Sequence, residues 1–196
     1  MITENSIINW LKLHCKIQPD TEILINECYV ELWAVILNTI ICAHNINPKN
    51  ILCTIRYLLS IEKLFSCFQC AKILCFFGFK NFDDFFNING WREEELGNSP
   101  YRQTTSVFSY YILKSAILFN LTMFLDFCKS GKLTKDLITF KQTEENLNNF
   151  FDIIVNCLSD EDYQNNVNFY MELIKNNNDN SFIFNTLRMT AIEQKL

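Results

Sequence analysis

The scarcity of glycine and proline is the feature that most constrains the fold of this chain. Its 196 residues include only 4 Gly and 3 Pro. A β-sandwich or barrel needs many tight turns, and tight turns depend on these two residue types. The chain is also 49% hydrophobic, which provides ample material for a buried core. We therefore predict an all-α fold of long helices joined by a few polar loops.

Apolar periodicity and capping residues predict about four core helices. The segment 67–79 either continues the third helix, which starts at Pro48, or begins a new one, and Gly78 marks its end. We expect a helical bundle of about four core helices around a Cys-x-x-Cys helix. The predicted helices cover residues 7–17, 20–43, 48–79 and 101–128.

The composition changes at Lys132, where the chain becomes richer in Asn, Asp and Glu. We place a domain boundary there, with a helical core at residues 1–131 and an acidic, Asn-rich helical extension at residues 132–196. Residues 176–180 are a polar linker within this extension. Amphipathic helices are predicted at 143–158, 160–175 and 181–192.

Charge and hydropathy exclude several classes of partner. The net charge is −5 and no basic run is present, so we expect no nucleic-acid binding. The chain start lacks a signal-peptide pattern, so we expect an intracellular protein that is not secreted. The apolar stretch 32–43 is too short to span a bilayer. The stretch 107–127 carries Lys114, Asn120 and Asp126, so a buried amphipathic helix explains it better than a membrane span.

The cysteines supply the one segment expected to do chemistry, Cys67-Phe68-Gln69-Cys70. Two cysteines three residues apart can close a redox disulfide, and a helix N-terminus would make the first thiol reactive. The alternative is that both are small core residues among the 9 Cys of the chain. A zinc site is a third interpretation, with Cys75 and either Cys128 or His44 as further ligands, but no second paired motif exists.

Three other residues have both a structural and a functional interpretation. Trp33 is either a core residue or a plate that stacks on a flat cofactor. Asn120 interrupts an apolar helix and must find hydrogen-bond partners on a neighbouring helix or on a ligand. Lys114 either extends to solvent or reaches an anionic group.

The order of these segments resembles the Erv/ALR-type FAD-dependent sulfhydryl oxidases. The resemblance is to their relatives in large DNA viruses of insects, the baculovirus type. It rests on a Trp helix at residues 31–37, a Cys-x-x-Cys helix at 64–71 and a later helix at 109–123, and it covers roughly residues 25 to 130. The family has His at the positions of Leu37 and Phe119, so its polar FAD contacts are depleted here.

The resemblance implies a mechanism and a cofactor. Cys67 and Cys70 would be the catalytic pair, and a substrate dithiol would reduce their disulfide through a mixed disulfide. Electrons would then pass to FAD and on to oxygen. Trp33 would stack on the FAD, Phe119 and Asn120 would lie at the position that holds it, and Lys114 would offset its pyrophosphate charge.

We therefore expect an FAD-linked thiol oxidase that forms disulfides in thiol-containing protein substrates, in the cytoplasm or nucleus of a host cell or in a virion. The family also suggests a homodimer. The alternative is a catalytically impaired relative that acts as a helical structural or interaction protein, with residues 132–196 as its partner surface.

Overall fold

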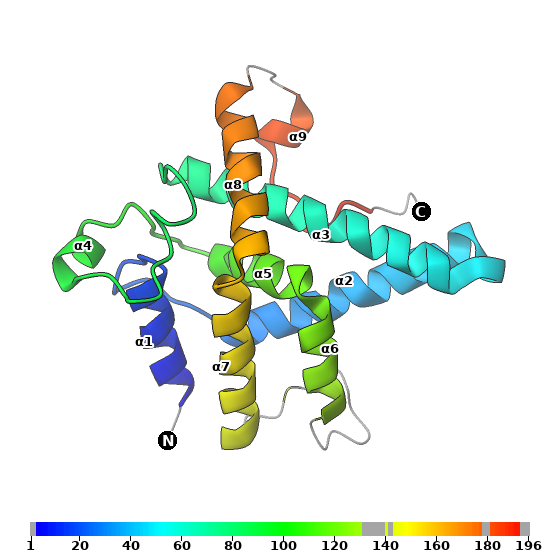
Figure 1. Cartoon of the computed structure of the whole chain (residues 1–196), viewed down its shortest axis with the longest axis horizontal. Helices are drawn as coiled ribbons and strands as arrows, with labels where there is room; N and C mark the ends of the chain where they lie inside the picture. The colour runs from blue at the N-terminus through cyan, green and yellow to red at the C-terminus, as the bar shows by residue number, and fades with distance from the viewer. Residues whose placement is uncertain (1–2, 131–139, 141–142, 178–180, 193–196) are drawn as a thin grey trace.

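The computed structural model describes residues 3–130, 140, 143–177 and 181–192. Within these residues the regular elements are all helical, which confirms the predicted all-α class. Figure 1 shows their arrangement. In chain order they are α1 (Glu4–His14), α2 (Ile25–Ile46), η1 (Pro48–Asn50), α3 (Ile51–Phe76), α4 (Glu93–Gly97), η2 (Phe108–Leu113), α5 (Lys114–Phe119), α6 (Leu121–Ser130), α7 (Glu144–Leu158), α8 (Glu161–Asn176) and α9 (Phe182–Asn185).

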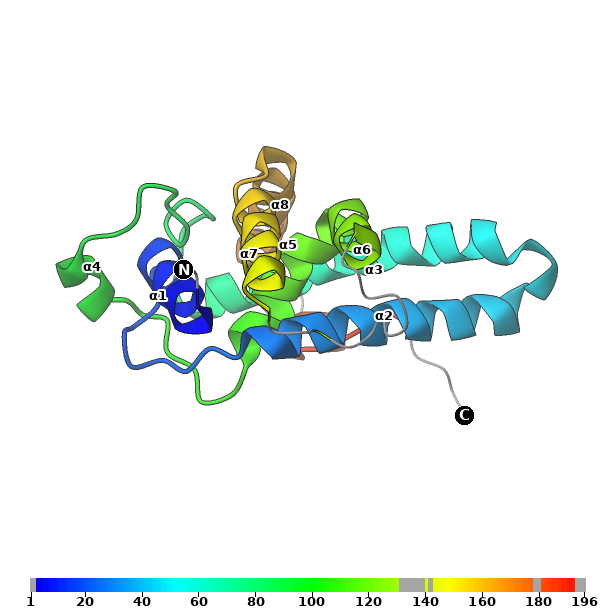
Figure 2. The same ribbon diagram turned by 90° about the horizontal axis from the view of Figure 1, so that it is seen from below.

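Two long helices, α2 and α3, form an antiparallel hairpin whose closed end projects from one side of the molecule (Figure 2). The turn between them is short because Asn47 caps it, accepting a hydrogen bond from the backbone N–H of Asn50 at 3.2 Å. Pro48 follows at the first position of η1, where its missing N–H leaves no hydrogen bond unmade. The remaining helices gather around the other end of the hairpin.

The helices α5 and α8 pack against α3 at the base of this hairpin, α7 packs against α5, and α8 crosses α3 (Figure 1). Residues from α1, α2, α3 and α5 to α8 share one hydrophobic core. The predicted extension contributes Phe150 and Ile154 of α7 and Tyr163 of α8, all at most 1% exposed. Helices on both sides of residue 131 therefore contribute to one core; the domain boundary itself stays a prediction.

Capping side chains start the two tail helices where the sequence predicts. Thr143 accepts a hydrogen bond from Asn146 N–H at 3.2 Å, and Asp160 accepts one from Tyr163 N–H at 2.8 Å. The end of α3 is also as predicted, because Gly78 adopts a positive φ of 83° that favours glycine. Local chemistry thus determines these three boundaries.

The prediction of one helix over residues 101–128 is wrong. The segment is a π-helix, η2, followed by α5 and α6, and the chain bends by 87° between α5 and α6. The bend lies at Asn120, whose φ of −104° and ψ of 40° end α5. It allows Phe124 of α6 to pack edge to face against Tyr29 of α2, with ring centroids 5.4 Å apart. A straight helix would carry Phe124 away from this contact.

Two other predicted helices differ from the structure. The predicted helix 20–43 starts later, at Ile25, with Leu24 as its N-cap. The predicted helix 181–192 is helical only over α9, and residues 186–192 are non-helical.

Among the described residues, one helix, α2, is long and apolar enough to cross a membrane, with a mean hydropathy of 1.3 over its best window. Half of that window is buried inside the protein. The bent pair formed by residues 108–119 and 121–129 passes the same test only if it is counted as one span. The expected absence of a membrane span stays a prediction.

Candidate functional site

The Cys67–Cys70 pair lies in the interior of α3, which runs unbroken from Ile51 to Phe76. Of the two alternatives for residues 67–79, the structure shows the continuation of the preceding helix. Sixteen residues of α3 precede Cys67, so the positive end of the helix dipole is too far away to lower the pKa of its thiol. One of the expected sources of cysteine reactivity is therefore missing.

The surroundings of both thiols favour the protonated form. Cys67 and Cys70 are 0% exposed and are free thiols. Burial raises the pKa of Cys67 to about 12, although the nearby Ser115 hydroxyl and the charge of Lys63 act in the opposite direction. Burial also raises the pKa of Cys70, against the effect of a hydrogen bond from Tyr163. Since the thiolate is the nucleophile, neither cysteine is activated in this state.

Tyr163 of α8 organises the space beside the pair. Its hydroxyl donates to Cys70 Sγ at 3.4 Å and lies 3.4 Å from the backbone oxygen of Ile112. Its ring packs against Phe119, with centroids 5.7 Å apart. The structure therefore brings Cys70 and Phe119 together around a tyrosine that the sequence analysis did not single out. A flavin placed against Cys70 from this side would have to displace Tyr163, so the residues present do not fit the cofactor.

The other predicted cofactor residues have structural contacts of their own. Trp33 packs against Phe124 of α6, with ring centroids 5.9 Å apart. Asn120 lies at the bend between α5 and α6, and its buried Nδ2 atom has no hydrogen-bond partner. Lys114 is 1% exposed and donates a hydrogen bond to the backbone oxygen of Met189 at 2.8 Å. Its pKa is lowered by burial, with Glu31 acting in the opposite direction.

The zinc interpretation gains no support in the described part of the chain. No group of three or more His, Cys, Asp or Glu side chains lies close enough there to hold a metal ion. Cys75 Sγ donates to the backbone oxygen of Met171 at 3.8 Å, and Cys128 Sγ lies 3.8 Å from the hydroxyl of Tyr29. These two cysteines thus contact different neighbours rather than a common centre.

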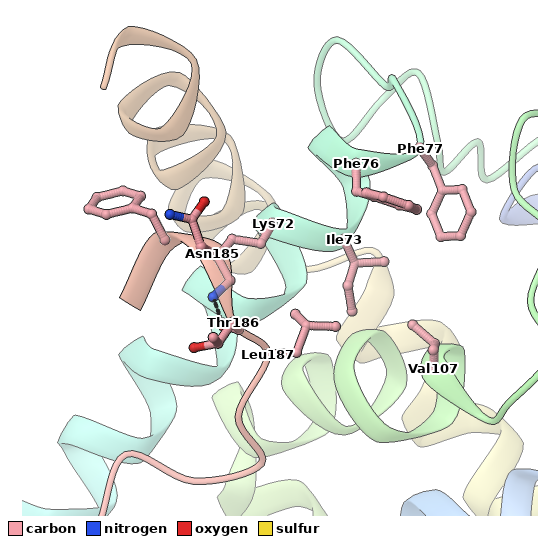
Figure 3. A pocket seen from close by; sticks show the side chains of 9 residues that line it. Lys72, Ile73, Phe76, Phe77, Val107, Asn185, Thr186 and Leu187 are labelled. Carbon is pink, nitrogen blue, oxygen red and sulfur yellow. Dashed lines mark hydrogen bonds between the residues drawn. The ribbon is translucent and has the colours of Figure 1, made fainter. Parts of the chain in front are cut away.

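An apolar pocket of about 250 Å³ lies beside the C-terminal part of α3 (Figure 3). Phe76 and Phe77 of α3, Val107 and Leu187 contribute apolar side chains, and Lys72 contributes its only charged one. Lys72 Nζ reaches across to the end of α9, where it donates to the backbone oxygens of Ile183 in α9, at 2.7 Å, and of Thr186 directly after it. None of the predicted cofactor residues lines this pocket.

Four buried polar residues form a second feature: sequence analysis missed Glu62, Gln69 and Lys72 of α3, and it singled out Lys114 of α5 for a different role. All are at most 8% exposed, and all contact the C-terminal part of the described chain. A signal existed, because the three residues of α3 are spaced by seven and three and so share one face of a mostly apolar helix.

Comparison with protein-family models, with curated proteins and with solved structures found no match for this chain.

Proposed function

We propose that this chain is a helical interaction protein that pairs with a second copy through the outer face of α2. The observation that carries this proposal is an apolar stripe on the projecting hairpin. Val30, Leu37 and Ile41 are 57%, 40% and 55% exposed, and Ala34 is exposed between them. Apolar side chains gathered on one exposed face are typical of a surface that is covered by a partner.

The spacing of this α2 stripe fits a helix as the partner. Its members follow one another by four, three and four residues, which is the spacing of a coiled-coil seam. An antiparallel, two-fold pairing of α2 with its copy places Val30 opposite Ile41 and Ala34 opposite Leu37. The same register places the Glu27 carboxylate opposite the exposed His44 imidazole, so polar groups of complementary character flank the apolar contact at both ends.

The C-terminal extension is a poorer candidate for the partner surface. Its helices α7 and α8 turn most of their apolar residues into the common core, and only Phe169 and Leu173 of α8 remain as exposed large apolar side chains on these two helices. Deleting residues 132–196 would uncover that core, and loss of binding by such a deletion would not identify an interface. Point substitutions on α2 test the proposal more directly.

The test is the oligomeric state of the purified chain by light scattering after size exclusion. We expect a dimer for the wild type at micromolar concentration and a monomer for Leu37→Glu combined with Ile41→Glu. Phe169→Glu is the matched control, because Phe169 is 61% exposed on α8 and lies outside the stripe. A wild type that is monomeric at several hundred micromolar overturns the proposal, and vesicle binding by that monomer would assign the stripe to lipid.

Thiol oxidation is a second candidate, supported by one observation. Cys67 and Cys70 are one helical turn apart, and the hydrogen bond from Tyr163, the nearby Ser115 hydroxyl and the charge of Lys63 favour their thiolates. The burial that opposes ionisation is the larger effect at both cysteines, so the geometry favours the interaction protein. A flavin absorption band in the purified protein, together with thiol oxidation that Cys67→Ser and Cys70→Ser abolish, would reverse this order.

A further inference from the structure

The segment 183–192, called here the C-terminal strap, follows α3 in the opposite direction. Lys72 contacts residues 183 and 186, Gln69 contacts residue 188 and Glu62 contacts residues 190 to 192. The ten residues from Glu62 to Lys72 rise by about 15 Å along the helix. Five residues of extended chain cover a similar distance, about 17 Å. An extended segment at residues 186–188 therefore matches the spacing of the polar groups on α3, whereas a helical one would be too short, and the chain then bends at residues 189 and 191 around the Glu62 carboxylate.

The hydrogen bonds that hold the strap are made almost entirely to its backbone. Gln69 Oε1 accepts from Arg188 N–H at 3.3 Å, and Lys114 Nζ donates to Met189 O at 2.8 Å. Asn38 of α2 donates to Ile192 O at 3.1 Å. Together with Lys72, these side chains recognise peptide groups, which every residue carries. The groove therefore selects an extended main chain more than a particular set of side chains.

Glu62 is the exception, because it also recognises a side chain. Its carboxylate is 1% exposed and accepts hydrogen bonds from the N–H groups of Ala191 and Ile192, each at 3.1 Å. It also accepts a hydrogen bond from the hydroxyl of Thr190. Three donors on consecutive residues thus compensate one buried charge. A hydroxyl residue followed by two residues that are not proline satisfies this arrangement.

Few side chains of the strap add to this anchoring. Phe184 packs against Phe68, with ring centroids 5.4 Å apart, and Ile192 packs against the small apolar cluster that contains Leu58. Ile183 and Leu187 are each 45% exposed, and no residue of the strap is fully buried. The groove, in contrast, buries the charges of Glu62, Lys72 and Lys114. Apolar side chains would hold a permanent strap at least as well, because burying charges has a desolvation cost. Charged groups have the advantage that water can solvate them when the strap leaves.

We propose that this groove is a binding site for an extended peptide of a partner protein, and that the strap is its built-in competitor. The ligand carries Ser or Thr followed by two residues with free N–H groups, which is the chemistry of Thr190-Ala191-Ile192. The partner segment inserts antiparallel to α3 after the strap has left. This inference goes beyond pairing through α2 and does not depend on it.

A peptide of residues 182–192 with a fluorescent label tests the site in trans. The receptor is the full chain with Ala191→Pro, which removes one donor to Glu62 from the strap but keeps the groove intact. We expect this variant to bind the peptide at least tenfold more tightly than the wild type, in which the strap competes. The same peptide with proline in place of Ala191 is the matched control and should not bind. Addition of Glu62→Gln to the receptor should abolish binding.

Hydrogen exchange in the wild type provides a test that no variant can confound. If the strap dissociates from a folded body, the amides of Ala191 and Ile192 exchange through a local opening, well before those of α3. Exchange of these amides only together with the α3 core would identify a permanent structural segment and overturn the proposal. A folded Ala191→Pro chain that fails to bind the peptide would overturn it as well. Neither readout depends on the oligomeric state.

Discussion

Tyr163 donates a hydrogen bond to Cys70 Sγ at 3.4 Å, and this contact joins residues that are 93 positions apart in the sequence. Both side chains are fully buried. The contact places the polar end of a tyrosine, rather than solvent or a ligand, against one sulfur of the Cys-x-x-Cys pair. It also connects α8 to α3 at the centre of the core.

We expect Tyr163→Phe to lower the free energy of unfolding by about 1 kcal/mol, because it removes a buried hydroxyl from a sulfur and a carbonyl acceptor. The ring contacts with Phe82 and Phe119 remain in this variant. Urea denaturation gives the measurement. Tyr170→Phe is the control, because the Tyr170 side chain is only partly buried on the same helix, and its effect should be within about 0.5 kcal/mol. A larger loss for the control would contradict this assignment.

Local signals in the sequence predicted the parts of the fold that depend on local chemistry. Thr143 and Asp160 start their helices through their own side chains, and Gly78 ends α3 through its own backbone freedom. Each signal lies within a few residues of the structure that it determines. The all-α class follows from the same kind of evidence, the scarcity of turn residues.

Long-range contacts determine the parts that the sequence did not predict. Asn120 was recognised as an interruption, but the bend there depends on Phe124 meeting Tyr29, 95 residues earlier. The strap was predicted as a helix because its apolar spacing fits one, yet partners such as Glu62 lie more than 120 residues away. The Cys-x-x-Cys motif was recognised from its spacing, but spacing carries no information on burial.

The reactivity of the cysteines provides a second prediction. Cys53 is exposed, whereas Cys67 is buried with its pKa raised to about 12. At pH 8 a thiol with that pKa is ionised in about one molecule in ten thousand. We therefore expect a maleimide or disulfide reagent to label Cys53 first, and Cys67 and Cys70 only after denaturation. Peptide mapping of the labelled protein gives the measurement, and rapid labelling of Cys67 in the folded protein would favour the thiol oxidase.

Lys72 gives a third prediction, which concerns pH. Burial lowers the pKa of its amine to about 8, so below that pH the folded protein bears the cost of a buried charge. In the unfolded chain the Lys72 amine has the ordinary lysine pKa. Between pH 8 and that value, Lys72 therefore holds its proton more often in the unfolded chain than in the folded protein. The stability contributed by Lys72 therefore increases as the pH rises through this window and is reduced below it. The neutral amine can still donate to Ile183 O and Thr186 O.

Comparison of the wild type with Lys72→Met measures this contribution by urea denaturation at several pH values. The difference in free energy of unfolding should grow in favour of the wild type as the pH rises from 7 to above 9. Lys49→Met, at an exposed lysine of η1, is the control and should show no such trend. A difference that shrinks with rising pH would show that the charged form of Lys72 is the one that stabilises the fold.

Thr190 provides the last prediction, because its hydroxyl is the one side-chain group of the strap that Glu62 binds. Thr190→Val keeps the shape of the side chain but removes the donor to a buried carboxylate, a loss of about 1.5 kcal/mol or more. We expect the amides of Ala191 and Ile192 to exchange about tenfold faster as a result. Thr190→Ser keeps the hydroxyl and should leave the rate close to that of the wild type.

Thr190→Glu places a second carboxylate against Glu62 and should release the strap more fully than Thr190→Val does. Equal exchange in Thr190→Val and the wild type would show that backbone donors alone hold the strap, and the hydroxyl requirement for a partner peptide would then fall.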